Sequence, residues 1–443
     1  MKKSLVSTLV LLLALCAAAG ELTVDFKFNK SEPFYNVGEK VVITAQVLDD
    51  GKPAAGQNVR FQFSCNKKYL KDIRKTDGGK EYVFEHTPEA PGFVSLRVFA
   101  VDENGKVITR EVKRGNRIIK LHALGGCGVM VAPEKLQVSV AEPADFDEFW
   151  SQVKADLAKV PVKEIERKRI ENSKADVYDV KIACIGEKPV SGYLCIQKNA
   201  KTKSLPAMVF FHGAGVYSSY ANVSRAAEGF IYFDVNAHGI ENGKPKEFYK
   251  DLTANYYLPK GKPGYPQWNK NDRDKFYFKG MFARVIRALE YVKTLPEWDG
   301  KHLIVAGGSQ GGAQTLIACG MDKDVSLARC EVPAMCDHSG AAAGHLRGWP
   351  KLVALKKDGS PADPAVVKAS GYYDCVNFAK RVKCPIYFST GGWDFTCSPT
   401  SVYKAYNNVP AGVFKSIEFT PTGNHGGSKT KKFENALKKH IKE

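Results

Sequence analysis

Apolar and polar residues alternate in the first quarter of the chain, and this pattern predicts β-strands. The segments VGEKVVITAQV (37–47), NVRFQFSC (58–65) and FVSLRVFAV (93–101) place an apolar side chain at every second position. Turn signals such as DDGKP (49–53) separate them. Short alternating strands joined by turns are typical of a β-sandwich, so a small all-β domain is predicted over residues 21–123.

A different pattern follows a predicted linker at 124–143, which contains GGCG and two prolines. The segment DFDEFWSQVKADLAKV predicts an amphipathic helix that Asp145 caps, with Glu148 three residues later. Beyond it, a hairpin (177–184 with 192–198) precedes apolar strands that alternate with helices such as 281–295. These strands are expected at 206–213, 229–235, 302–307, 327–332, 385–391 and 414–420. Such alternation predicts an α/β domain over 144–443, with a doubly wound, mostly parallel sheet.

Residues 1–20 have the composition of a secretory signal peptide. Two lysines precede an apolar stretch that is short for a membrane span and ends in Ala17-Ala18-Ala19. A lipoprotein interpretation through Cys16 is disfavoured, because Leu15 stands where processing requires a small residue. We therefore expect a secreted or periplasmic protein, and no later segment predicts a membrane span.

Ten further cysteines would then lie in a compartment where disulfides persist. Cys184 and Cys195 are equidistant from the turn assumed for the predicted hairpin, so they are candidates for a pair. Buried free thiols are the alternative, because spacing does not establish geometry. The chain offers no C-x-x-C motif or Cys/His cluster, so neither a metal nor a cofactor is expected.

The formal net charge of the chain is +18. In an intracellular protein this charge would suggest nucleic acid as a partner. Here the basic residues are scattered and export is predicted, so no nucleic acid is expected. General solvation by lysine accounts for the charge, and attraction to acidic polysaccharide is the alternative.

A glycine-rich serine motif follows the strand predicted at 302–307. Residues 307–311 read Gly-Gly-Ser-Gln-Gly, a G-x-S-x-G pattern, and a helix-compatible segment comes next. In a nucleophile elbow the serine lies on a strand-to-helix turn so sharp that only residues without side chains fit beside it. The pattern also occurs by chance or as ordinary turn glycines, so the assignment of Ser309 depends on partners elsewhere.

Two loops after later strands supply those partners. Asp394 lies in GGWDFTCSPT after the strand at 385–391, and His425 lies in TGNHGG after the strand at 414–420. Serine needs an imidazole to accept its proton, and the imidazole needs a carboxylate to fix its tautomer and stabilise its charge. The order Ser309, Asp394, His425 is that of an α/β-hydrolase. The oxyanion is expected to meet the backbone N–H groups of Gln310 and Ala214.

Other aspartates and histidines have plainer interpretations. Three aspartates compete with Asp394, but none follows a strand in the slot of the acid: Asp322, Asp337 and Asp374. Among the histidines near the expected site, His212 is interpreted as bracing its turn. The others are interpreted as structural or pocket-lining: His238, His338 and His345. All proposed catalytic groups lie beyond residue 210, so we expect the β-domain to be dispensable for hydrolysis of a small soluble ester.

Several motifs resemble the acetyl xylan esterase and cephalosporin-C deacetylase family, carbohydrate esterase family seven. They are GGSQGG, GGWDFTCSPTSVYKAYN, AEPADFDEFW, YYDCVNFAKRVKCP and the run FKGMFARVIRALEYVKTLPEWDGKHLIVAGGSQGG. The resemblance covers about 143 to 443 and implies an α/β-hydrolase that removes acetyl groups from acetylated carbohydrate, with the same triad and N–H donors. The stretch FYNVGEKVVITAQVLDDGKPAAGQNVRFQF separately resembles immunoglobulin-like modules appended to exported enzymes.

The chain departs from the family at two places. Asn236-Ala237-His238 stands where the family has Arg-Gly-Gln, and Ala214 replaces a tyrosine after His-Gly. These changes put the substrate preference and the family's oligomeric ring in doubt, so homo-oligomerisation is left open. Tyr217, His238 and Trp393 are expected to line the substrate pocket.

Two other classes of function compete with deacetylation. One is another exported serine hydrolase, a glucuronoyl esterase or a peptidase, although peptidases of this fold usually carry a propeller that the N-terminal region cannot supply. The other is a non-catalytic carbohydrate-binding or adhesion protein, against which the complete set of serine, aspartate and histidine argues.

Overall fold

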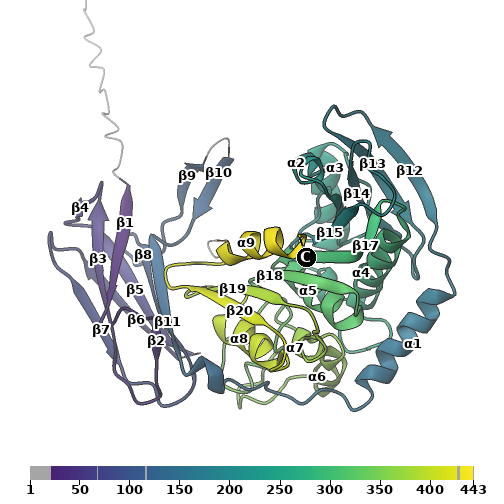
Figure 1. Ribbon diagram of the computed structural model, residues 1–443. Coiled ribbons are helices and arrows are strands. Elements are labelled where there is room, and N and C mark those ends of the chain that lie inside the picture. Colours follow the sequence, from purple (N-terminus) through teal and green to yellow (C-terminus); the bar gives the residue numbers. More distant parts are fainter. Residues whose placement is uncertain (1–20, 67, 115–116, 427–429, 443) are drawn as a thin grey trace, which may run out of the picture.

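The computed structural model describes residues 21–66, 68–114, 117–426 and 430–442. The predicted signal peptide lies outside these residues. Within them, an N-terminal β-region stands beside a larger α/β domain (Figure 1). None of the helices described there is long and apolar enough to cross a membrane.

The β-region consists of two sheets and a separate hairpin. One sheet has the order β1-β3-β4 with β7 also paired to β3, and the other has the order β2-β11-β8-β5-β6. Side chains of both sheets share one core that includes Val41, Phe61 and Val98. The strands are β1 Leu22–Phe28, β2 Phe34–Tyr35, β3 Val41–Asp49, β4 Lys52–Pro53, β5 Asn58–Cys65, β6 Lys68–Lys75, β7 Tyr82–His86, β8 Gly92–Ala100, β9 Arg110–Arg114, β10 Arg117–Leu121 and β11 Gly125–Val131.

The prediction of a linker at 124–143 is wrong for its first half. That half forms β11, which lies between β2 and β8 and is almost entirely buried. The glycines of GGCG suggested a flexible connection, but here they allow other backbone to approach the strand. The chain leaves the β-region only after Val131.

The α/β domain has one nine-stranded sheet in the order β12-β13-β14-β16-β15-β17-β18-β19-β20. Strands β12, β13 and β14 are antiparallel to their neighbours, and β14 also pairs antiparallel with β16. The six strands from β15 to β20 run parallel to one another. The strands are β12 Glu164–Ile170, β13 Ala175–Ile182, β14 Val190–Gln197, β15 Leu205–Phe211, β16 Ile231–Val235, β17 Trp298–Gly308, β18 Val325–Glu331, β19 Ile386–Gly391 and β20 Lys415–Thr420. This mostly parallel sheet confirms the predicted fold class.

Helices cover both faces of the sheet, as the strand–helix alternation predicts. Val209 of β15 belongs to the core shared with α4 and α5, whereas Met208 packs on the other face with Phe433 of α9. The helices are α1 Phe146–Ala158, α2 Val223–Ala227, α3 Lys246–Leu252, α4 Tyr277–Thr294, α5 Gln310–Met321, α6 Pro364–Gly371, α7 Cys375–Ala379, α8 Pro399–Asn408 and α9 Lys431–His440. Three short helical turns lie at Pro133–Lys135, Thr253–Tyr257 and Tyr265–Gln267.

The predicted side-chain cap at Asp145 does not form, and of the two alternatives for Cys184 and Cys195 the structure has the free thiols. Asp145 precedes α1 but makes no side-chain capping bond, because its carboxylate pairs instead with Arg273, 2.6 Å away. Cys195 lies opposite Val177 rather than Cys184, because the hairpin pairs symmetrically about Gly186. All ten cysteines in the described residues are free thiols.

The β-region packs directly on the loop that carries Asp394. It also contacts the neighbouring loop that carries His425, where the amide of Gly128 in β11 donates to the carbonyl of Pro421 at 2.9 Å. A Cβ on Gly128 would lie 1.9 Å from the carbonyl oxygen of Gly392, so only glycine fits there. The guanidinium of Arg97 lies 3.7 Å from the centre of the Phe395 ring. Because of these contacts, we no longer expect the β-region to be dispensable for hydrolysis of a small ester.

Gly128→Ala is therefore expected to lower kcat on 4-nitrophenyl acetate by about tenfold or more, because the methyl group must displace the Gly392 backbone and with it Asp394. Gly125→Ala in the same strand is the matched control, since its Cβ would meet side chains only at 3.4 Å or more. Steady-state kinetics on variants with equal thermal stability make the comparison. Wild-type kcat in folded Gly128→Ala would show that β11 does not position the acid loop, the loop after β19 that carries Asp394.

A buried ion pair fixes the segment after β11 to the α/β domain. Lys404 of α8 and Asp337 are 1% and 4% exposed, and their charged atoms lie 2.6 Å apart. The other carboxylate oxygen of Asp337 accepts the amide of Ser139 at 2.8 Å. Removing one partner leaves an uncompensated buried charge.

Lys404→Ala is expected to lower the free energy of unfolding by about 3–5 kcal/mol. Lys27→Ala is the control, because Lys27 forms an ion pair with Glu81 on the exposed surface of the β-region. Urea denaturation of both variants measures the difference. Equal midpoints for the two variants would contradict a stabilising role for the buried pair.

Candidate active site

Ser309 lies on a strained turn between β17 and α5. Its backbone has φ 59° and ψ −122°, a region that residues with a Cβ rarely adopt. A Cβ on Gly307 would lie 2.4 Å from the carbonyl oxygen of Gly311, and one on Gly311 would lie 1.9 Å from that of Phe211. The two glycines are thus required by close backbone approach, which is the geometry of a nucleophile elbow.

His425 and Asp394 complete a hydrogen-bonded chain with this serine. Nε2 of His425 lies 2.9 Å from Oγ of Ser309, and Nδ1 lies 2.8 Å from Oδ2 of Asp394. The Asp394 side chain is 0% exposed, and its other oxygen accepts the amides of Thr396 and Cys397 at 2.8 and 2.9 Å. These bonds fix the carboxylate, so Nδ1 donates to it and Nε2 faces the serine as a proton acceptor.

Gln310 begins α5 directly after the serine. The first amides of a helix have no intrahelical acceptor, and they lie at the positive end of the helix dipole. The hydroxyl of Tyr265 donates to the buried side chain of Gln310 at 2.7 Å. Tyr265 comes from the Tyr/Lys/Pro-rich segment before α4, and no sequence signal linked it to the elbow.

The turn that carries Ala214 is held by His238 and His212. Nε2 of His238 donates to the carbonyl of Gly215 at 3.1 Å, and Nδ1 accepts from the hydroxyl of Tyr277 at 2.5 Å. Burial lowers the pKa of His238 to about 3, so the ring is neutral. Nε2 of His212 accepts the amide of Ala237 at 3.3 Å, and burial lowers its pKa to about 4. Both rings therefore support the turn without charge.

The residues that replace the family's Arg-Gly-Gln join the same network. The Asn236 side chain donates to the carbonyl of Tyr217 at 3.0 Å and accepts the amide of His238 at 2.9 Å. Arg284 of α4 donates to the carbonyl of Ala237 at 2.9 Å. Arg284 of α4 thus holds the turn that follows β16.

Tyr217, His238 and Trp393 are expected to line the substrate pocket, and they differ in exposure and in the segments that they contact. His238 is fully buried beneath the Gly215 turn, so of the two roles predicted for it, structural or pocket-lining, its position fits the structural one. Trp393 packs over Gly126 of β11, which joins the loop of Asp394 to the β-region. Its indole N–H donates to the carbonyl of Thr422 at 2.8 Å, in the loop that carries His425. Tyr217 is 40% exposed, and its hydroxyl donates to the carbonyl of Gly213 at 3.2 Å, beside the serine.

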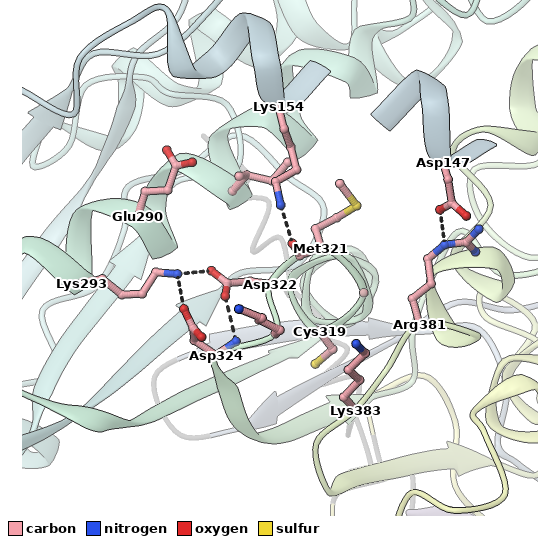
Figure 2. Close-up of a pocket in the computed structure, with 13 residues that line it drawn as sticks. Asp147, Lys154, Glu290, Lys293, Cys319, Met321, Asp322, Asp324, Arg381 and Lys383 are labelled. Atoms are coloured by element: carbon pink, nitrogen blue, oxygen red, sulfur yellow. Dashed lines mark hydrogen bonds and ion pairs between the residues drawn. The ribbon is translucent and has the colours of Figure 1, made fainter. Parts of the chain in front are cut away.

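The three competing aspartates have structural partners away from Ser309. Asp322 lies in a polar pocket at the far end of α5, where its carboxylate pairs with Lys293 at 2.8 Å (Figure 2). Asp337 forms the buried ion pair described above. Asp374 caps α7 and accepts the amides of Asp337 and His338, each at 2.7 Å. The pKa of Asp374 is raised to about 7. Burial disfavours its ionised form, and the negative charge of the neighbouring Asp337 disfavours it further.

Comparisons with known proteins agree with this architecture. The acetyl esterase Axe7A of Xylanibacter ruminicola is 29% identical over 407 residues, which cover 90% of this chain and 85% of that protein. An acetyl xylan esterase from Paenibacillus sp. R4 shares the fold with a TM-score of 0.58 at 24% identity, over 70% of this chain and 98% of that one. Acetyl xylan esterase 1 from Thermoanaerobacterium sp. JW/SL YS485 gives a TM-score of 0.55 at 22% identity, over 70% and 96%.

The family model for acetyl xylan esterases (AXE1) matches residues 134–442, which include β12 to β20 and the whole hydrogen-bonded chain around Ser309. The match covers well over half of the chain. The chain therefore belongs to the acetyl xylan esterase family and is a carboxylic ester hydrolase.

Proposed function

We propose that this protein is an exported serine esterase that removes acetyl groups from acetylated sugars of the xylan type. The observation that carries the proposal is the chain Ser309–His425–Asp394, with distances of 2.9 and 2.8 Å, at the carboxyl ends of parallel strands. Membership of the acetyl xylan esterase family and the name of the Xylanibacter relative support the acetyl group as the acyl group.

In the proposed mechanism, Oγ of Ser309 attacks the acetyl carbonyl while Nε2 of His425 accepts its proton. Asp394 stabilises the imidazolium through Nδ1. The backbone N–H groups of Gln310 and Ala214 bind the oxyanion. The bond between the acetyl carbon and the sugar oxygen then breaks, the imidazolium protonates that oxygen to give the sugar hydroxyl, and an acetyl-serine remains. Water, deprotonated by the same imidazole, attacks this ester, and acetate leaves as Ser309 regains its proton.

Export is proposed from the signal-peptide composition of residues 1–20 and gives a secreted or periplasmic enzyme. For the β-region we propose an immunoglobulin-like module that also supports the acid loop. Its two sheets with a common core are consistent with that class. The docking of Gly128 against Gly392 supports the second role.

The proposal is tested by measuring acetate release from acetylated xylo-oligosaccharides beside methanol release from methyl glucuronate esters. We expect acetate release at a kcat/KM at least about a hundredfold higher. Preferential methanol release would instead support the glucuronoyl esterase alternative. Hydrolysis of neither substrate by folded protein would contradict a sugar esterase of either kind.

The same proposal predicts a steep dependence on acyl length. A chain that does not fit the acyl pocket loses the near-attack geometry entirely, whereas each fitting methylene contributes only about 1–3 kcal/mol. The kcat/KM values for 4-nitrophenyl esters should fall from acetyl through propionyl to butyryl, with hexanoyl nearly inert. A maximum at butyryl or longer would mark a general esterase.

A further inference from the structure

A hollow of about 380 Å³ opens beside the nucleophile, on the face of the sheet opposite α5. Gly213 and Gly308 form the wall nearest Ser309; a Cβ on Gly213 would lie only 3.7 Å from the Cβ of that serine. The hollow therefore begins where an ester bound to Ser309 has to extend. The mechanism assigns no role to the side chains on its other walls.

Two carboxyl side chains reach this hollow from neighbouring strand ends. Asp234 of β16 pairs with Phe210 of β15, and Glu331 of β18 pairs with Gly308 of β17. Because β-strand side chains alternate between faces, these registers put both carboxyl groups on one face. Gly308 lies between the two carboxyl groups and has no side chain to fill the hollow. A Cβ built on it would be 3.7 Å or more from every atom of Glu331.

Asp234 has unused hydrogen-bonding capacity in this place. The residue is 3% exposed, and Oδ1 has no hydrogen-bond partner within the described part of the chain. Burial raises its pKa to about 7. A buried polar atom without a partner is costly, so it marks a position where a ligand's donor gains binding energy.

In the part of the chain that the structure describes, Glu331 receives side-chain hydrogen bonds through one carboxylate oxygen. Oε1 accepts the amide and the hydroxyl of Thr430 at 3.2 and 3.4 Å. Oε2 lies 3.9 Å from the place where a Cβ of Gly308 would be, on the side of the hollow. A carboxylate held through one oxygen presents the other in a fixed direction.

Two tyrosines also line the hollow. Tyr220 is 74% exposed, the largest exposure among the large apolar and aromatic side chains in the described residues, and Tyr217 beside it is 40% exposed. An exposed aromatic ring at the edge of a polar hollow offers an apolar face on which a ligand can pack. The apolar face of a tyrosine packs well on the C–H face of a pyranose.

We propose that this hollow is the subsite for the sugar that carries the ester, an uncharged pyranose that stacks on Tyr220 and donates hydroxyl hydrogens to Asp234 and Glu331. The inference rests on the proposed deacetylase function and narrows its substrate. Two carboxyl groups in one small site accept neutral hydroxyl donors but disfavour a uronic acid, whose carboxylate would be buried beside them.

The test compares kcat/KM for acetylated xylotriose with kcat/KM for 4-nitrophenyl acetate, which has no sugar. In Tyr220→Ala, Asp234→Asn and Glu331→Gln, the ratio of the two values should fall about tenfold or more, mainly through KM for the sugar ester. Tyr256→Ala is the matched control, because Tyr256 is an exposed tyrosine that does not line the hollow. Its ratio should equal that of the wild type.

Tyr220 is exposed, so its variant remains informative even if a buried variant fails to fold. An unchanged ratio in folded Tyr220→Ala, with wild-type protein active on acetylated xylotriose, overturns the subsite and leaves the proposed function intact. No activity of the wild type on acetylated xylotriose, with turnover of 4-nitrophenyl acetate, overturns the proposed function itself.

A second measurement addresses the charge of the sugar. We compare two inhibitors of 4-nitrophenyl acetate hydrolysis, xylotriose and xylotriose with a glucuronic acid substituent on the xylose that would occupy the hollow. The inhibition constant of unsubstituted xylotriose should be about tenfold lower. Equal or stronger inhibition by the acidic sugar would overturn the preference for a neutral ligand.

Discussion

Ser309→Ala is expected to reduce kcat on 4-nitrophenyl acetate by about 10⁴-fold or more. Among the described residues, the Ser309 hydroxyl is the nucleophile that the His425 imidazole faces, at 2.9 Å, and residues of a triad act as a unit. The rate that remains is expected to come from the proposed oxyanion N–H groups and from substrate binding.

The substitution should not unfold the protein, because the backbone strain at Ser309 comes from the glycine-flanked turn, which alanine keeps. Thermal melting of Ser309→Ala beside the wild type checks this point. A folded variant that keeps more than about a tenth of the wild-type rate would contradict Ser309 as the nucleophile.

Asp394→Asn is expected to lower kcat by about 10³- to 10⁴-fold. Asparagine keeps the shape of the side chain, and its oxygen can still accept the amides of Thr396 and Cys397. The amide nitrogen that then faces Nδ1 is a donor, so the imidazole is held in the wrong tautomer and its charged form loses its partner.

Asp322→Asn is the control for this variant, because Asp322 pairs with Lys293 at the far end of α5. Its kcat should stay within about threefold of the wild type. A loss in Asp322→Asn as large as in Asp394→Asn would mean that the rate reports stability rather than the chemistry of the acid.

The positions of the main elements followed from local sequence patterns. The apolar face Phe146, Phe149, Trp150, Val153 and Leu157 of α1 is buried as the helical period predicts. The predicted parallel strands occur within a few residues of their expected bounds. Ser309, Asp394 and His425 were found from the order of motifs after strands, because parallel strands bring the loops at their carboxyl ends to one edge of the sheet.

Features that depend on contacts between distant segments could not be predicted in this way. Asp145 has the spacing of a helix cap, but Arg273 from another segment takes its carboxylate. The glycines of β11 have the composition of a linker, and only the docked Gly392 loop explains them. Asp234 and Glu331 are separated by almost a hundred residues, and the strand order rather than the sequence places them at one hollow.

The central claim is that His425 and Asp394 activate Ser309 for attack on an ester. Labelling with a fluorophosphonate, followed by peptide mapping, tests it most directly, because the reagent reacts with activated serines. We expect a single labelled peptide that contains Ser309, with labelling at least about a hundredfold slower in His425→Ala. A label on another serine, or equal labelling of Ser309 without the imidazole, would contradict the account.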